Sequence, residues 1–111
     1  MVTINIERGH PTVDAAETRL GGELYRVRST GAKYAKIIHG YGSSGTGGVI
    51  KSAMPRILRT YQSRRVVKSY IAGEDFGPYS AKAQEMASKY PELKKDPDWG
   101  RSNDGVTVVF F

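Results

Sequence analysis

The stretch IIHGYGSSGTGG (Ile37–Gly48) joins an apolar run to a turn that is dense in glycine, and a basic, amphipathic run follows it. Five of the nine residues from Gly40 to Gly48 are glycine. Glycine gives the backbone conformations that other residues rarely adopt, at a cost in chain entropy. The pattern predicts a strand over Ala35–His39, a tight turn and then a helix. This order of elements is typical of an α/β fold.

The same order repeats on both sides of this stretch. Alternation over Val2–Ile6 predicts a first strand, and Thr12 is a suitable N-cap for a helix that continues to about Arg28 and stops at Gly31. Pro55 lies inside the second helix and should kink or shorten it. Further strands are expected over Arg65–Ile71 and Gly105–Phe111, with a helical pattern over Tyr79–Tyr90.

These elements predict one α/β domain over residues 1–111. We expect a two-layer sandwich with the order β-α-β-α-β-(helical insertion)-β and a small mixed, mostly parallel four-stranded sheet. Residues 74–104, approximately, form the insertion and carry the only tryptophan, Trp99. The apolar residues expected to bury the insertion against the sheet are Phe76, Tyr79, Met86, Tyr90 and Leu93; a lid beside the basic face or a dimer contact is the alternative. Phe110 and Phe111 either complete the core or pack in a second subunit of a homo-oligomer.

Composition excludes several classes of protein. The chain has no cysteine and two histidines, too few for most zinc sites made by protein side chains alone. No apolar run approaches the roughly 20 residues of a membrane span, and the first residues lack a signal-peptide pattern. We therefore expect a cytoplasmic protein without a membrane partner.

The net charge of +6 is unevenly distributed. Leu24–Gly73 contains ten Lys and Arg residues and no acidic residue, whereas the rest of the chain has a net charge of −4. This segment is either a face for a polyanion such as nucleic acid or a solvated basic surface without a partner. The candidate phosphate contacts nearest the glycine turn are Lys36, Lys51, Arg56 and Arg59.

The glycine turn matches G-x-G-x-x-G at Gly40–Gly45, but a dinucleotide site is not expected. No acidic residue occurs between the turn and Glu74 to hold a ribose, and the turn follows the second predicted strand rather than the first. A P-loop is not expected either, because no glycine of the turn precedes Lys and Ser/Thr. The remaining interpretations are a phosphate cradle of backbone N–H groups (Gly40, Gly42, Ser43, Gly45) or a plain connector.

Three chemistry-bearing residues follow the first two strands. Glu7 and His10 follow the first strand and His39 ends the second, so parallel pairing would bring them to one sheet edge. A carboxylate can act as a base or hold a metal ion, and histidine transfers protons near neutral pH. These three residues are the candidate catalytic group.

The segment Ile37–Gly42 resembles the H-G-x-G signature of the Smr (small MutS-related) domain family. Ile6–Val13 occupies the place of that family's first strand and L-D-x-H segment, and Arg65–Ser69 and Gly105–Val109 resemble its last two strands. The resemblance covers about residues 1–73 and 104–111 and is to a stand-alone member without the MutS ATPase core.

The resemblance implies a fold like the C-terminal domain of bacterial translation initiation factor three. It also implies nucleic-acid binding, with DNA nicking or RNA cleavage in some members and Mg²⁺ or Mn²⁺ dependence where they cleave. His39, Gly40 and Gly42 match H-G-x-G, and Glu7 takes the place of the aspartate. Gly9 stands where the family has histidine, and His10 comes one residue later, so the first-strand motif is weakened relative to the family.

The basic segment, the glycine turn and the family resemblance together suggest three functions. The first is sequence-tolerant binding of DNA or RNA through the phosphate backbone. The second adds metal-assisted phosphodiester cleavage by Glu7, His10 and His39. The third is a protein-interaction or ribosome-docking module without catalysis.

Overall fold

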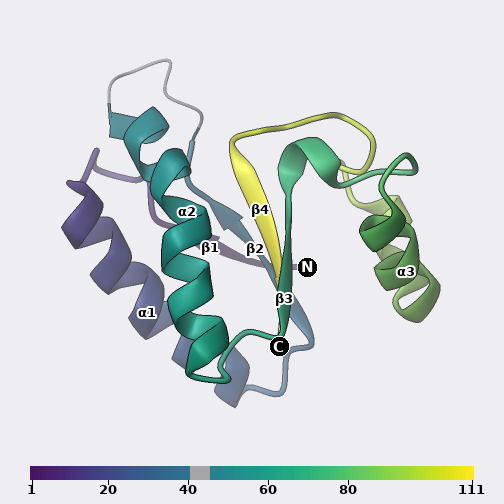
Figure 1. Cartoon of the computed structure of the whole chain (residues 1–111), viewed down its shortest axis with the longest axis horizontal. Coiled ribbons are helices and arrows are strands. Elements are labelled where there is room, and N and C mark those ends of the chain that lie inside the picture. Colours follow the sequence, from purple (N-terminus) through teal and green to yellow (C-terminus); the bar gives the residue numbers. More distant parts are fainter. Residues whose placement is uncertain (41–45) are drawn as a thin grey trace.

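A four-stranded mixed sheet with the order β1-β2-β4-β3 forms the centre of the protein (Figure 1). The computed structural model describes residues 1–40 and 46–111. Its strands are β1 (Val2–Asn5), β2 (Tyr34–Ile38), β3 (Ser69–Ala72) and β4 (Val106–Phe110). β1 pairs with β2 in parallel, while β4 is antiparallel to both β2 and β3. The α/β class and mixed sheet are thus confirmed: three strands run in one direction, although two of the three pairings are antiparallel.

Two helices, α1 (Val13–Ser29) and α2 (Thr46–Ser63), cover one face of the sheet (Figure 1). The Thr12 hydroxyl caps α1 by accepting a hydrogen bond from the Ala15 N–H at 3.1 Å. The helix ends where Gly31 takes a φ of +85°, a conformation that favours glycine. Both predicted boundaries are confirmed. α2 continues past Pro55 to Ser63, so the proline does not shorten it.

The first core lies between these helices and the sheet. On α1 the buried residues recur at helical spacing; they are Ala16, Leu20, Leu24 and Val27. They pack against Ile4 and Ile37 of the sheet and against Ile57 and Leu58 of α2. This packing holds α2 in place despite its interior proline.

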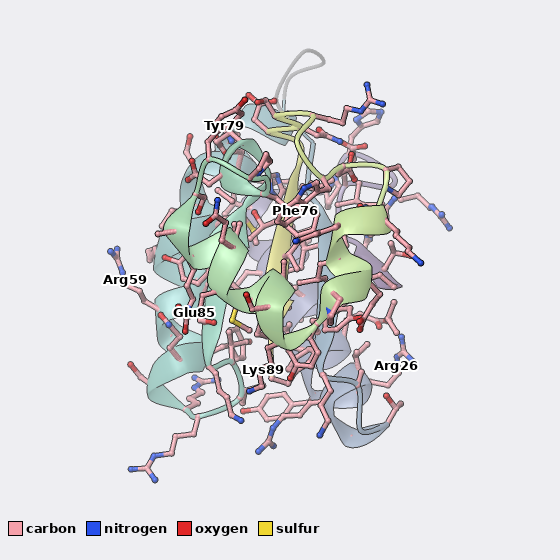
Figure 2. All side chains as sticks on the ribbon, turned by 90° about the vertical axis from the view of Figure 1, so that its right-hand side faces the viewer. Arg26, Arg59, Phe76, Tyr79, Glu85 and Lys89 are labelled. Atoms are coloured by element: carbon pink, nitrogen blue, oxygen red, sulfur yellow. The ribbon has the colours of Figure 1, made fainter. Side chains whose placement is uncertain are left out.

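The insertion covers the opposite face of the sheet and adds a third layer to the two predicted. It contains η1 (Gly73–Asp75), α3 (Ala81–Lys89) and η2 (Pro91–Lys95). Figure 2 looks onto this layer, with Phe76 beneath its helices. Phe76 and Trp99 meet edge to face at 5.1 Å between ring centroids. The residues of this second core are Ile71, Phe76, Ala83, Met86, Leu93, Val108 and Phe110.

The expected burial of the insertion is therefore confirmed, with one exception. Tyr79 lies fully exposed in the turn before α3 instead of against the sheet. Phe110 completes the second core, and Phe111 packs against the first. Within the described residues, no helix has the length and apolar character needed to cross a membrane.

Candidate functional site

His39 follows β2 at the edge of the sheet where the glycine turn begins. Its backbone N–H donates to the Gly105 carbonyl at 3.0 Å, and the Gly40 N–H donates to the same oxygen at 3.0 Å. These bonds tie the end of β2 to the start of β4. They also occupy the Gly40 amide, which the sequence had suggested for a phosphate.

The His39 ring is buried, and both of its nitrogens have partners. Nδ1 lies 2.8 Å from the Gly40 carbonyl oxygen, and Nε2 lies 2.9 Å from the Thr107 hydroxyl. Because a carbonyl only accepts, Nδ1 carries the proton and Nε2 accepts from Thr107. Burial lowers the pKa of His39, and the Lys51 ammonium acts in the same direction. The ring is therefore neutral at neutral pH and links β2 to β4.

A cleft of about 260 Å³ opens beside this ring. It is lined by His39, Lys51, Ser52, Met54, Pro55, Tyr70, Ala72, Glu74 and Thr107. Lys51 Nζ lies 2.9 Å from a Glu74 carboxylate oxygen and 3.0 Å from the Asp104 carbonyl. Burial alone would raise the pKa of Glu74, but the hydrogen bond from Lys51 outweighs it and holds that pKa below its usual value. The ion pair links α2 to the start of the insertion.

The ends of β1 and β2 adjoin, as the parallel pairing requires. Asn5 is in register with Ile38, and the Ile6 N–H donates to the Ile38 carbonyl at 3.0 Å. Glu7 follows in a tight turn, in which its carbonyl accepts from the His10 N–H at 3.1 Å. The turn needs two successive residues with positive φ, Gly9 at +83° and His10 at +49°. Glycine at position 9, where the family has histidine, suits this backbone.

The side chains at this edge do not fit a divalent ion held by the protein. Among the described residues, no group of three or more His, Asp or Glu side chains could hold a metal ion. Beside the cleft the donors are one imidazole, with both nitrogens bonded, and one carboxylate paired with Lys51. The Mg²⁺ or Mn²⁺ that the resemblance implies for cleaving members therefore lacks a fitting donor set among the described residues beside the cleft.

The predicted phosphate contacts lie in different environments. Lys36 is buried on the insertion side, with its Nζ 2.6 Å from a carboxylate oxygen of Asp96 and 2.6 Å from one of Asp98. Burial would lower the pKa of Lys36, but these two hydrogen bonds raise it above the ordinary value. Its charge is thus used inside the protein and is not available to a ligand.

Arg56 and Arg59 lie on the exposed side of α2. Arg56 pairs with Glu17 of α1 at 3.1 Å, whereas Arg59 points away from the protein and has no ion pair within the described residues (Figure 2). The remaining predicted contacts Gly42, Ser43 and Gly45 lie outside the described residues.

Five further cations gather at the opposite end of the sheet, which we call the basic pole; they are Arg28, Lys33, Arg64, Arg65 and Lys68. All five are exposed, and within the described part of the chain none forms an ion pair. Backbone bonds hold the pole together, because the Lys68 N–H donates to Phe110 at 2.8 Å and the Phe111 N–H donates to Lys33 at 2.9 Å. The sequence identified the basic segment but could not separate its paired cations from its unpaired ones. The carboxylates that pair with the segment lie outside it in the chain.

Thr107, Tyr70 and Glu74 were not singled out from the sequence. Only Thr107 carried a signal, as the one polar residue within the apolar run Val106–Phe110. A buried hydroxyl in such a strand needs a hydrogen-bond partner, and His39 supplies it.

Comparison with known proteins agrees with the motif at His39. The family model of the Smr domain matches residues 8–78, more than half of the chain, and ends just inside the insertion. Searches of the curated proteins and of the solved structures gave no match. The match includes β2, the end of that strand at His39 and Gly40, and both helices of the first core. The chain therefore belongs to the Smr domain family.

Proposed function

We propose that this Smr domain binds DNA or RNA through phosphate contacts centred on the basic pole. Smr domains generally bind nucleic acid. The observation that carries the location is the distribution of unpaired charge. Of the ten cations in the acid-free segment, four pair with carboxylates: Arg26, Lys36, Lys51 and Arg56. Among the residues that the structure describes, the cations of this segment without an ion pair are Arg59 and the five of the basic pole.

The geometry of the pole suits a phosphate backbone. Arg28 and Lys33 flank the connection from α1 to β2, while Arg64, Arg65 and Lys68 lie on the connection from α2 to β3. Both connections lie at the same end of the sheet (Figure 1). Exposed Lys and Arg side chains contact phosphates without reading bases, so binding should tolerate changes of sequence.

The salt dependence of affinity tests this proposal. If the pole makes about four phosphate contacts, the plot of log affinity against log salt has a slope near −3.6 for duplex DNA and near −2.8 for a single strand. The double variant Arg65→Gln/Lys68→Gln should reduce the slope by about 2 units on a duplex. Arg56→Gln, which removes a cation already paired with Glu17, is the matched control. A slope near zero, or an equal effect of the control, contradicts the proposal.

The second candidate is phosphodiester cleavage, and the cleft beside His39 favours it. There an imidazole, a phenol, an ammonium and a carboxylate line one cleft. Since both His39 nitrogens are bonded, the ring must release Thr107 before it transfers a proton. Glu7 and His10, in the adjoining turn, remain the other candidate catalytic residues.

Cleavage is tested on supercoiled plasmid and single-stranded RNA, with Mg²⁺, Mn²⁺ or a chelator. The proteins compared are wild type, His39→Gln, Glu7→Gln, His10→Gln and Tyr70→Phe, each checked for folding by circular dichroism. Loss of cleavage in His39→Gln with retained binding supports catalysis. Equal activity in all preparations indicates a contaminating nuclease and rules the candidate out.

A further inference from the structure

The outer edge of β1 is an open row of backbone hydrogen-bonding groups. The Ile6 N–H donates to Ile38 of β2, and bonding alternates along a parallel strand, so the peptide groups of Ile4 also face β2. Those of Thr3 and Asn5 therefore point away from the sheet. No strand in the described part of the chain pairs with this edge. Such an edge can pair with another extended chain.

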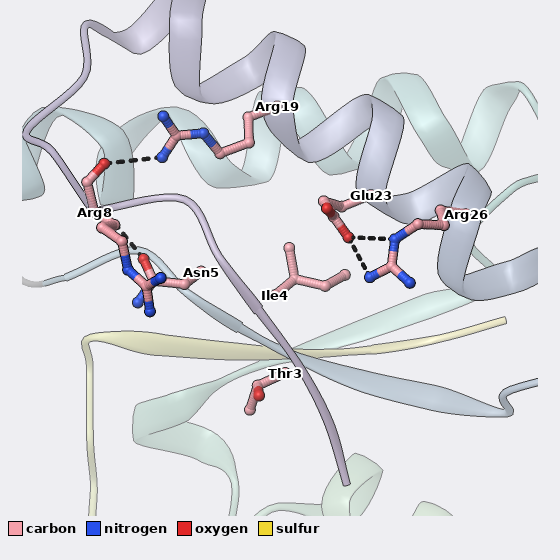
Figure 3. Close-up of a pocket in the computed structure, with 7 residues that line it drawn as sticks. All are labelled: Thr3, Ile4, Asn5, Arg8, Arg19, Glu23 and Arg26. Atoms are coloured by element: carbon pink, nitrogen blue, oxygen red, sulfur yellow. Dashed lines mark hydrogen bonds and ion pairs between the residues drawn. The ribbon is translucent and has the colours of Figure 1, made fainter.

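A groove of about 370 Å³ runs between this edge and α1 (Figure 3). Its polar lining consists of Thr3, Asn5 and Arg8 from the β1 side and Arg19, Glu23 and Arg26 from α1. The three α1 residues are spaced i, i+4 and i+7 and so share one helix face. That face runs beside the edge strand, so charged side chains follow the groove along its length.

The groove has a net positive charge. Arg26 pairs with Glu23, with nitrogen–oxygen distances of 2.9 and 2.6 Å. Arg19 donates to the Arg8 carbonyl at 2.9 Å, a bond that leaves both guanidinium charges uncompensated. Within the described residues, neither Arg8 nor Arg19 forms an ion pair with a carboxylate. The lining of the groove thus carries three guanidinium groups and one carboxylate.

We propose that this groove binds an extended acidic segment of a partner protein, which adds to the sheet as a fifth strand beside β1. Main-chain hydrogen bonds to Thr3 and Asn5 supply the pairing, as in other strand additions, and acidic side chains meet Arg8 and Arg19.

The open edge favours a peptide over the other occupants. The edge offers both N–H donors and C=O acceptors. The phosphate groups of a nucleic acid only accept hydrogen bonds at neutral pH, so they would leave the outward carbonyls of β1 without donors. A second copy of the chain would bring its own arginines against these, and like charges disfavour that pairing. An acidic peptide satisfies the backbone and the charge together.

The test uses a fluorescein-labelled seven-residue peptide in which glutamate alternates with valine or threonine, with binding followed by fluorescence anisotropy. Thr3→Pro removes the outward N–H without touching the bonds to β2, because proline is tolerated at an edge position whose N–H faces solvent. We expect it to weaken binding about fivefold. Arg8→Gln/Arg19→Gln should weaken binding by about tenfold, while Arg59→Gln, on α2, leaves it unchanged.

Four further measurements identify the occupant. The amides of Thr3 and Asn5 should gain protection from hydrogen exchange with bound peptide, and a peptide N-methylated at alternate residues should not bind. A thymidine oligonucleotide that competes for the groove and responds to the arginine variants but not to Thr3→Pro would identify a phosphate site and overturn the proposal. A dimer in sedimentation velocity that Thr3→Pro abolishes, or the absence of peptide binding, also overturns it. None of these variants changes the basic pole, so the two proposals fail independently.

Discussion

His39 is the more deeply buried of the two histidines. Both of its ring nitrogens are hydrogen-bonded inside the protein, so a residue of the family motif also has a structural role. The sequence placed it correctly at the end of a strand. It could not show that Thr107, 68 residues away, engages Nε2. The bond depends on β4 pairing with β2, which is a property of the whole sheet. A role in stability is therefore expected from His39 whatever its role in chemistry.

The pH dependence of stability reports the His39 environment. Its folded-state pKa is lowered by burial, so the unfolded chain takes up a proton first as the pH falls below about 6.5. Unfolding then becomes easier by up to about 1.4 kcal/mol per pH unit until the folded-state pKa is reached. Thermal melts from pH 7.5 to 5 should show this loss in wild type and in His10→Gln, which changes only an exposed histidine. The corresponding part of the pH slope should disappear in His39→Gln; its persistence would contradict this assignment.

Lys36 illustrates a charge that only the structure could assign. Its side chain is 9% exposed, and its partners Asp96 and Asp98 are 10% and 19% exposed. Lys36→Met leaves two partly buried carboxylates without their cation and should lower the free energy of unfolding by about 3 kcal/mol or more. The triple variant with Asp96→Asn and Asp98→Asn should recover much of that loss. Urea denaturation measures both, and equal stability of the single variant and wild type would contradict the prediction.

Among the secondary-structure elements, α1 and α2 are in close contact at Gly21 of α1. A Cβ at Gly21 would lie 2.1 Å from the Tyr61 hydroxyl oxygen, whereas a Cβ at the neighbouring Gly22 meets nothing within 4 Å. The Tyr61 ring has little room to move, because it is buried and packs edge to face on Tyr25. In the sequence the two glycines are adjacent and alike, and only the structure shows that Gly21 alone lies against Tyr61.

Alanine at the two positions should therefore have opposite effects. Gly22→Ala removes the helix cost of glycine without a clash and should stabilise the protein by about 0.5–1 kcal/mol. Gly21→Ala should destabilise it by about 1–3 kcal/mol, because the new methyl group overpacks the contact with Tyr61. Chemical denaturation of the two variants compares them directly, and a stabilising Gly21→Ala would show that α1 and α2 can separate at little cost.

Strands were predicted correctly where the apolar or β-branched residues also form backbone hydrogen bonds to a neighbouring strand. The prediction failed where those backbone groups bond elsewhere. Arg65–Ile71 was expected to be extended throughout, yet β3 begins only at Ser69. Val66 and Val67 are buried as strand residues would be, but their N–H groups donate to the Tyr61 carbonyl at the end of α2. A run of β-branched residues indicates that the side chains are buried. It does not indicate the partners of the backbone N–H groups, which here are set by the end of α2. The caps of α1 were predictable because their partners lie within a few residues.

At the scale of the molecule, the described residues form two cores, one on each face of the sheet, and the insertion builds the second. Ile71, Val108 and Phe110 are at most 3% exposed beneath it. Replacing residues 76–102 with a short Gly/Ser linker should expose this face, giving an aggregation-prone or loosely packed protein. Gel filtration and binding of a hydrophobic dye measure the change, with Tyr79→Ser as the control, since that exposed ring lies outside the core. A monomeric variant with an unchanged Tm would show that the second core is dispensable.

The central place of β4 has a consequence for how the chain folds. Its residues pair with β2 partners 68 to 76 positions earlier, and it also separates β2 from β3. Until β4 arrives, the sheet is a parallel β1–β2 pair with β3 unattached, and neither face can close over its core. Pairings of such high contact order make folding slow compared with a helical bundle of similar size. During synthesis, α1 and α2 emerge from the ribosome before β4, and the sheet cannot form without β4. The apolar faces of both helices therefore stay exposed until the last strand has been made.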